Sequence, residues 1–495
     1  EGAAHIAEVR LVSQRLAGVP IEPNGCVAVP DGDALTVWVP SQNPQPVAAA
    51  LGRLIDMEPP ALRVAVPKAM GGGFGSKAGL YAEFVIVATL ARLLDRPLKW
   101  TETRSENMVA MNQGRAMVLD AKMGFTSDGR IIGLDVDAVA DTGAYPAIGA
   151  ILPTFTQKMT QGVYDIPRIR FVADAVVTNS STTAAYRGAG RPEATQMLER
   201  VLDVAAGELG LDPVEIRRRN LIAPDAFPYT TLTGANYDNG EYERALDAVL
   251  AAADYDGLRA EQARRRESGD AVELGIGVST YVEVTAPSGL SSEFGAVEID
   301  DDGKVVAKVG TSAHGQGHLT AFSMVISDML GVPMDDITIL QSDTAVVPKG
   351  KGTMGSRSLQ TAGAALHVAS ETVLTKARTL AGHLLEAAAA DIVTGDGGLH
   401  VAGVPANAVS WAELYAASND ERRRPADMAP GLASELDFDG GDSTYPFGKG
   451  GNKVPVEKDF TFLTDLLTVD GKLPRSQDYT FYTDLESNLP QLTRL

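Results

Sequence analysis

Three consecutive glycines constrain this chain more than any other feature of its sequence. Gly71, Gly72 and Gly73 separate a short apolar run, residues 64–66, from an apolar segment of helical character, residues 80–94. The order predicted is strand, bare loop and helix. Ordering three glycines costs conformational entropy, so a folded chain keeps them where the backbone takes positive φ or lies against a bulky group. The N–H groups of such a loop, next to a helix start, form a surface suited to an anion.

We therefore expect residues 71–77 to cradle a large, phosphate-bearing ligand, and the alternative is an ordinary tight turn. Two familiar phosphate loops are excluded. A Walker loop needs glycine directly before Lys77, where this chain has Ser76. A dinucleotide fingerprint counted from Gly71 needs glycine at position 76 and fails at the same serine.

Composition narrows the classes of protein. At 495 residues the chain is too long for one core and should contain two or three domains. Its net charge of −21 argues against nucleic acid and anionic membranes as partners. The single cysteine, Cys26, excludes disulfides and a protein-ligated iron–sulfur cluster within this sequence, and favours a cytoplasmic setting. The histidines form no zinc pattern, and no apolar run has the length of a membrane span.

Further loops, each placed at a helix start, recur along the chain. They lie at residues 184–192, 310–318 and 349–358. The pattern predicts an α+β fold of two similar domains facing one ligand. The expected bounds are 1–225 for the first domain, 226–270 for a helical connector, 271–447 for the second domain and 448–495 for a tail that we leave unassigned.

Periodicity and turn signals predict the elements between these loops. Strands are expected at residues 34–40, 131–140, 169–178, 274–284, 294–300, 305–309 and 337–341. Helices are expected at residues 46–57, 80–94, 193–209, 243–254, 255–268, 319–330 and 359–390, with another beginning at Asp212 and Pro213.

The fourth loop matches G-x-G-x-x-G at Gly350, Gly352 and Gly355. A nicotinamide fingerprint needs a strand directly before it and an acidic residue after the next strand. Here an irregular segment comes first, and Glu371 lies inside the predicted helix, so that interpretation is disfavoured.

The same loop carries Thr353, Ser356, Arg357 and Ser358, a set of hydroxyls and one guanidinium that suits a phosphate. A serine-rich helix cap with a solvated arginine is the alternative. Gln316 stands between two glycines, where its amide suits a heterocycle edge or a metal-bound oxygen. Arg187 either faces a ligand or forms a structural ion pair.

Taken together, these loops resemble those of molybdenum-cofactor large subunits of the xanthine oxidase, aldehyde oxidase and carbon monoxide dehydrogenase-like family. The resemblance covers about residues 8 to 446 and rests on ordered motifs. The motifs are Pro20-Ile21-Glu22-Pro23-Asn24-Gly25, Gly71-Gly72-Gly73-Phe74-Gly75, Ala185-Tyr186-Arg187-Gly188-Ala189-Gly190-Arg191-Pro192-Glu193, His314-Gly315-Gln316-Gly317-His318 and Gly352-Thr353-Met354-Gly355-Ser356-Arg357-Ser358.

The resemblance implies a molybdopterin cofactor, in its cytosine dinucleotide form, and oxidative hydroxylation of an aldehyde or N-heterocycle with oxygen from water. Electrons would leave through 2Fe–2S clusters to FAD. Because one cysteine cannot ligate such clusters, these groups would sit on a small and a medium partner subunit, in a dimer of heterotrimers. The cofactor-binding residues that it implies are Gly72, Gly73, Phe74, Gly75, Arg187, Gly188, Gly315, Gln316, Gly317, Thr353, Gly355, Ser356, Arg357 and Ser358.

Departures from the family pattern limit this expectation. Ala78 stands where purine-oxidising members have a glutamate, and residues 188–190 lack the copper-binding cysteine of the carbon-monoxide-oxidising branch. No Gly-x-Gly-Glu segment, which supplies the family's general base, follows Phe447. We therefore assign no catalytic residue and no metal-ligating side chain, and nominate neither Glu283 nor Glu293 as base.

Two further hypotheses stay open. The chain is a non-catalytic or truncated subunit that keeps the cofactor cradle, or it is a nicotinamide-dependent dehydrogenase without a metal.

Overall fold

The computed structural model describes residues 2–287, 289–395, 397–446 and 461–467. It divides into two compact units that are each built from separate stretches of chain. Unit 1 includes the described residues of 1–17, 112–284 and 444–495, and unit 2 includes those of 18–111 and 285–443. The predicted domain bounds follow the order of the motifs, whereas these units follow packing, so the two divisions differ.

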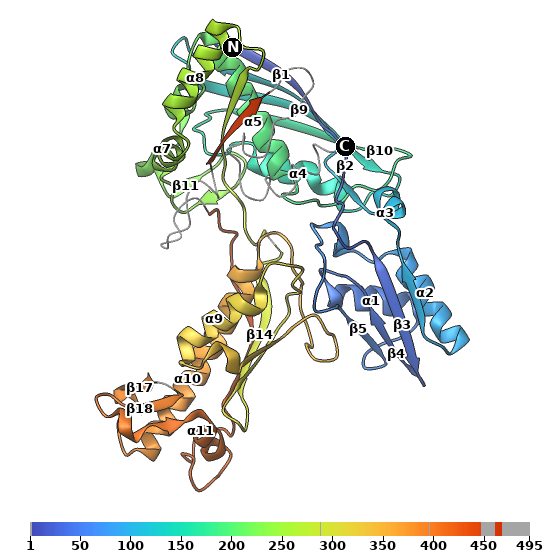
Figure 1. The fold of residues 1–495 in the computed structure, drawn as a ribbon, viewed down its shortest axis with the longest axis vertical. Coiled ribbons are helices and arrows are strands. Elements are labelled where there is room, and N and C mark those ends of the chain that lie inside the picture. Colours follow the sequence, from blue (N-terminus) through green and yellow to red (C-terminus); the bar gives the residue numbers. More distant parts are fainter. Residues whose placement is uncertain (1, 288, 396, 447–460, 468–495) are drawn as a thin grey trace. The chain divides into compact units, whose positions relative to one another are not determined.

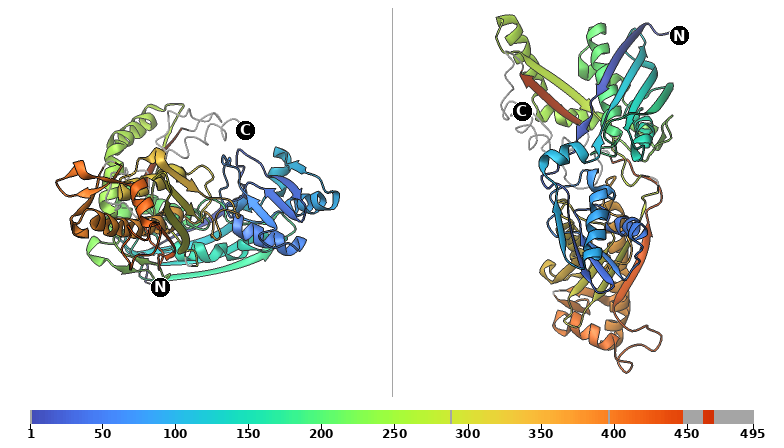
Figure 2. Two further views of the ribbon diagram at one scale, coloured as in Figure 1. Left: turned by 90° about the horizontal axis from the view of Figure 1, so that it is seen from below. Right: turned by 90° about the vertical axis from the view of Figure 1, so that its right-hand side faces the viewer.

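Unit 1 is built on a four-stranded sheet in the order β1-β8-β9-β10. The strands are β1 (His5–Ser13), β8 (Met117–Phe125), β9 (Ile131–Gly143) and β10 (Ile169–Val177). Alternate residues of β8 are buried, which is the pattern of a sheet with one covered face. Helix α5 (Arg191–Leu209) packs against β1 and β8, and lies beside the strands in Figures 1 and 2.

Helix α5 begins two residues before the predicted residue 193. Pro192 occupies its first turn, where a missing N–H costs nothing, and Gly210 ends it in the left-handed conformation. Further elements of unit 1 are β2 (Leu16–Ala17), β7 (Gln113–Gly114), α4 (Leu152–Met159), α6 (Pro213–Asn220), β11 (Tyr229–Thr230), β12 (Asn236–Tyr237), α7 (Tyr242–Ala252), α8 (Tyr255–Ser268) and β13 (Leu274–Thr280). The predicted strand at 274–284 therefore ends early.

Most of the unassigned tail lies outside the described residues. Within it, the backbone of β21 (Thr461–Leu467) pairs antiparallel with β13.

Unit 2 contains two four-stranded sheets. The first has the order β5-β4-β3-β6 and consists of β3 (Gly25–Asp31), β4 (Ala34–Trp38), β5 (Leu62–Ala65) and β6 (Leu98–Thr101). Helices α1 (Pro44–Ile55) and α2 (Ala82–Leu94) pack on it, and α3 (Arg104–Ala110) follows β6 (Figure 1). The glycine loop joins β5 to α2, so the predicted order of strand, loop and helix is confirmed.

The second sheet has the order β16-β15-β14-β20. Its strands are β14 (Ser292–Ile299), β15 (Val305–Val309), β16 (Ile337–Leu340) and β20 (Ala433–Asp439). Helices α9 (His318–Leu330) and α10 (Ala364–Leu384) cover it. Beyond α10 follow β17 (Ile392–Gly395), β18 (Gly398–Val401), β19 (Val409–Ser410) and α11 (Trp411–Ser418).

The helix predicted at residues 359–390 is wrong at both ends. A π-helical turn, Leu359–Gly363, precedes α10. The other end folds back because Glu386 takes a left-handed φ of 52° and the Ala387 N–H bonds to the Gly382 carbonyl. The α+β class, with two regions of mixed helix and strand, is confirmed.

Candidate cofactor-binding loops

Three of the four predicted loops lie in unit 2, and the loop at residues 184–192 lies in unit 1. The glycine loop holds positive φ at Gly72, Phe74 and Gly75, with values of 91°, 53° and 99°. Phe74 is its exposed side chain, at 36% of full exposure. A non-glycine residue pays for this conformation, so the loop must be held by its surroundings.

The N–H groups of this loop are only partly available to an anion. The Gly71 N–H donates to Glu22, the Gly75 N–H to Gln42 and the Ser76 N–H to the Gly73 carbonyl. Fewer N–H groups of this loop are therefore available to a ligand than the sequence predicts.

Gln42 connects the glycine loop to the fourth loop. Its side-chain oxygen accepts the Gly75 N–H at 2.8 Å, and its Nε2 donates to the Thr353 carbonyl at 2.9 Å. Its backbone carbonyl accepts the Thr353 N–H at 3.0 Å. A Cβ added to Gly73 would lie 2.7 Å from the Gln42 side-chain oxygen, so glycine is needed there. Sequence reasoning missed Gln42, although a polar stretch of three residues between Pro40 and Pro44 was a usable signal.

The third loop has the most open backbone. Gly315 and Gly317 take φ of 116° and 75°, and a Cβ added to either would meet nothing within 4 Å. Within the described residues, the N–H groups of Gly315, Gln316 and Gly317 have no acceptor, and they lie directly before α9. A helix start with exposed donors favours an anionic ligand.

The Gln316 side chain folds onto its own loop. Its oxygen accepts the His314 N–H at 2.7 Å, and its NH₂ group lies 2.7 Å from the His314 Nε2. Burial lowers the pKa of His314 to about 4 and also lowers the pKa of His318. His314 is therefore neutral near pH 7, and its ring nitrogen accepts from the amide.

Thr353 joins the third loop to the fourth. Its hydroxyl accepts the Ser312 N–H at 3.0 Å and the Ser358 hydroxyl at 3.2 Å. Gly355 and Ser356 both have positive φ, and Ser356 is exposed. Thr353 and Ser358 thus order the loops, while Ser356 is the exposed hydroxyl of the predicted set.

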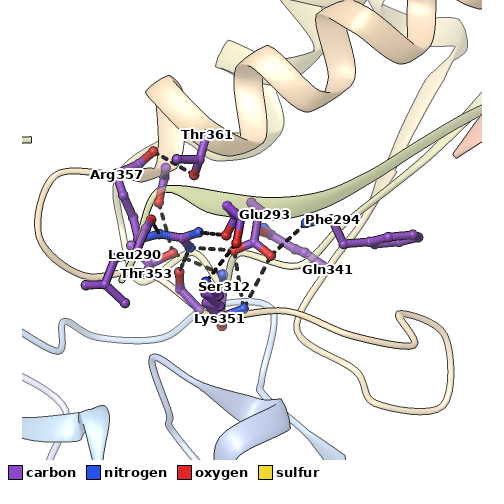
Figure 3. Close-up of polar contacts among 12 residues, drawn as sticks. Leu290, Glu293, Phe294, Ser312, Gln341, Lys351, Thr353, Arg357 and Thr361 are labelled. Carbon is purple, nitrogen blue, oxygen red and sulfur yellow. Dashed lines mark hydrogen bonds and ion pairs between the residues drawn. The ribbon is translucent and has the colours of Figure 1, made fainter. Parts of the chain in front are cut away.

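The Arg357 side chain, which the sequence predicts at a phosphate, is engaged inside the protein. Its guanidinium is fully buried and pairs with Glu293, whose side chain is 1% exposed (Figure 3). It also donates to the carbonyls of Leu290, Ser292 and Gly352 at 2.6 to 2.7 Å. Each guanidinium nitrogen thus has a partner inside the protein, which favours a structural role for Arg357. Its partner Glu293 is likewise engaged inside the protein by this ion pair.

In unit 1 the loop carrying Arg187 and Gly188 is held by two other arginines. Arg115 donates to the carbonyls of Tyr186 and Arg187 at 2.9 and 2.5 Å, and its guanidinium stacks over the Tyr186 ring. Arg191 donates to the Gly188 carbonyl at 2.7 Å and pairs with Glu283. Arg187 itself is exposed. The sequence analysis included Arg191 in the motif but predicted no role for it, and it did not identify Arg115.

The predicted residues thus fall into two sets. The first is exposed: Phe74, Arg187, Gly315, Gln316, Gly317 and Ser356. The second is at least partly buried and holds the loops in shape: Gly72, Gly73, Gly75, Gly188, Thr353, Gly355, Arg357 and Ser358. The open, glycine-flanked donors of the third loop fit an anionic cofactor.

Two features are absent from the described residues. No three His, Cys, Asp or Glu side chains gather there in an arrangement that could hold a metal ion. No helix in that part of the chain is both long and apolar enough to cross a membrane.

Comparison with known proteins places these loops in context. A family model described as a molybdopterin cofactor-binding domain matches residues 1–221, and a second model with the same description matches residues 248–464. The carbon monoxide dehydrogenase large chain of Hydrogenophaga pseudoflava is 37% identical over 451 residues, covering 88% of this chain and 56% of the relative. The nicotine 6-hydroxylase large subunit of Paenarthrobacter nicotinovorans is 32% identical, covering 92% of this chain and 57% of that one.

The fold is similar to solved structures as well. Quinoline 2-oxidoreductase from Pseudomonas putida 86 superposes with a TM-score of 0.87 at 29% identity, over 96% of this chain and 60% of that chain. Reconstituted CO dehydrogenase from Oligotropha carboxidovorans gives 0.84 at 29% identity, over 95% and 60%. The chain therefore spans little more than half the length of these relatives.

Proposed function

Because the chain belongs to the family of molybdenum hydroxylase large subunits and carries its molybdopterin cofactor-binding domains, we propose that it is the cofactor-binding catalytic part of a hydroxylating oxidoreductase. The substrate would be an N-heterocycle or an aldehyde. The reacting carbon would lose its hydrogen as two electrons and a proton and gain a hydroxyl group from water, which releases a second proton. When bound, the molybdenum centre supplies this oxygen and two-electron chemistry, and the protein supplies placement and electrostatics.

One observation carries the proposal: the third loop offers exposed N–H groups at Gly315, Gln316 and Gly317, directly before a helix start. These groups would hold an anionic part of the cofactor. Phe74 and Ser356 are the exposed side chains that the neighbouring loops contribute. Arg187 and Gly188 of unit 1 remain proposed cofactor-binding residues.

We propose the cytosine dinucleotide form of the cofactor, because its additional phosphate increases the demand for backbone donors. FAD and 2Fe–2S groups would lie on a medium and a small partner subunit. Relatives described as a large chain and as a large subunit support a multi-subunit assembly.

An N-heterocycle is the favoured substrate. The relatives include proteins described as nicotine 6-hydroxylase and quinoline 2-oxidoreductase. Carbon monoxide is disfavoured, because residues 188–190 contain no cysteine. Cys26 does not replace it, since it is buried in β3 and burial raises the pKa of its thiol to about 12.

A non-catalytic cofactor-binding subunit is the second candidate. It is favoured by the engagement of both carboxylates considered as a base: Glu283 pairs with Arg191 at 3.0 Å, and Glu293 pairs with Arg357. Neither carboxylate is free to take a proton from a reacting group.

An assay of the complete subunit with its partner chains separates these candidates. A dye acceptor, H₂¹⁸O and a panel of quinoline, nicotine, benzaldehyde, hypoxanthine and carbon monoxide would be used. Dye reduction with quinoline or nicotine, and ¹⁸O in the product, is the expected result. Bound molybdenum without turnover of any substrate would favour the second candidate, and a folded protein that takes up no molybdenum would overturn both.

A further inference from the structure

A buried lysine lies at the end of the glycine loop. The Lys77 side chain is 0% exposed, and its ammonium donates to Glu22 at 2.8 Å. Burial lowers the pKa of Lys77, and the neighbouring Glu22 opposes this effect. An unpaired ammonium at such a site would be costly, so the position of Glu22 fixes that of Lys77.

The same carboxylate oxygen also holds the beginning of the loop. It accepts the Gly71 N–H at 3.0 Å, while the Glu22 N–H donates to the Gly71 carbonyl at 3.2 Å. A Cβ at position 71 would lie 2.5 Å from the Glu22 Cβ, so glycine permits this approach. One carboxylate therefore closes a loop of seven residues.

Other charged and titratable groups surround this pair. Glu102 favours the charged form of Lys77, and Arg104 opposes it. Lys77 in turn helps to lower the pKa of His314 in the third loop, after the larger effect of burial. The Lys77 charge thus acts on both loops.

We propose that Lys77 and Glu22 are positioning residues, which close the glycine loop and keep Phe74 in its left-handed, exposed conformation for the cofactor. The inference rests on the proposed function for the identity of the ligand. Phe74 holds a φ of 53° that an unrestrained loop would release. Glu22 holds Gly71 and Lys77 at the two ends of the loop, and Gln42 holds Gly75. These contacts restrain the backbone of Phe74, which lies between them.

Three variants of the complete subunit test this proposal: Lys77→Met, Glu22→Gln and the double variant. Amide hydrogen exchange of residues 72–76 is measured on cofactor-free protein, and molybdenum content on protein from a cofactor-producing host. Glu22→Gln removes the carboxylate that pairs with the buried ammonium and should lower the melting temperature most. The double variant should recover that temperature, because no unpaired charge remains.

Loop order should not recover with it. We expect exchange at residues 72–76 at least about tenfold faster in Lys77→Met and in the double variant, since a charged hydrogen bond is lost. Molybdenum content should fall in both. Lys304→Met, which removes an exposed pair with Asp336 in the same unit, should change neither measurement.

Wild-type exchange and molybdenum content in the double variant would overturn the proposal. Loss of molybdenum without faster exchange would also overturn it, because Lys77 would then act by direct contact. Absence of molybdenum from the wild-type protein would refute the proposed function. The exchange measurement, which is made without cofactor, would still test whether Lys77 and Glu22 close the loop.

Discussion

The side chain of Gln42 donates to the backbone carbonyl of Thr353, 311 residues away in the sequence, at 2.9 Å. The same amide accepts the Gly75 N–H, so one buried side chain sets the glycine loop against the fourth loop. Ser312 completes the connection by donating its N–H to the Thr353 hydroxyl. Cofactor binding by unit 2 would depend on this internal network as much as on the exposed residues.

Gln42→Ala should lower the free energy of unfolding by about 1–3 kcal/mol, because the Gly75 N–H and the Thr353 carbonyl lose their partner. Molybdenum content should fall as well. Chemical denaturation and metal analysis measure the two effects. Gln45→Ala is the matched control, because the Gln45 amide donates only a long hydrogen bond, of 3.3 Å, to the Val347 carbonyl. Equal losses in both variants would argue against a special role for Gln42.

Gly73→Ala should disturb the same network, because its Cβ would displace the Gln42 side chain. Its effect on stability should therefore not add to that of Gln42→Ala. Gly79→Ala is the control, since a Cβ there meets nothing within 4 Å and the backbone φ is −104°. Additive effects of the Gly73 and Gln42 variants in a double-mutant cycle would contradict the geometry.

Arg357→Met should lower the free energy of unfolding by about 3–5 kcal/mol, because Glu293 would remain buried without its partner. Adding Glu293→Gln should recover much of this loss. Urea denaturation of the cofactor-free chain measures both. A stable Arg357→Met variant that merely loses cofactor would instead support the phosphate-binding role predicted from the sequence.

Stability should fall as the pH decreases from 6.5 toward 4, because of His314. The pKa of His314 is about 4 in the folded chain, compared with 6.5 for a histidine side chain in water. Between these two pH values the unfolded chain binds a proton that the folded chain excludes, so the free energy of unfolding decreases as the pH falls. Above pH 6.5, His314 is neutral in both states and causes no loss of stability. His314→Gln should therefore lose less stability than the wild type between pH 7 and pH 5. Identical losses would place the titrating group elsewhere.

Local patterns predicted much of this fold. The strand at residues 305–309 and the body of α5 follow from alternation and helical spacing, and the glycine loop follows from its composition. The end of α10 was missed because Glu386, and not glycine, takes the left-handed position.

Long-range pairing could not be predicted from these patterns. Arg357 stands among hydroxyls, as in a phosphate site, but its partner Glu293 comes from β14, 64 residues earlier. Gln42, Glu22 and Arg115 act on loops far from them in sequence, and no local pattern indicates which loop each one meets. The same reason explains why each compact unit combines separate stretches of chain.

Molybdenum content, measured by mass spectrometry together with the nucleotide released on acid treatment, tests the central claim most directly. The complete subunit would be purified from a host that makes the cofactor. We predict that each chain binds one cofactor, which gives about one molybdenum per chain and an equal amount of released cytidine phosphate. A folded subunit that contains neither would contradict the account.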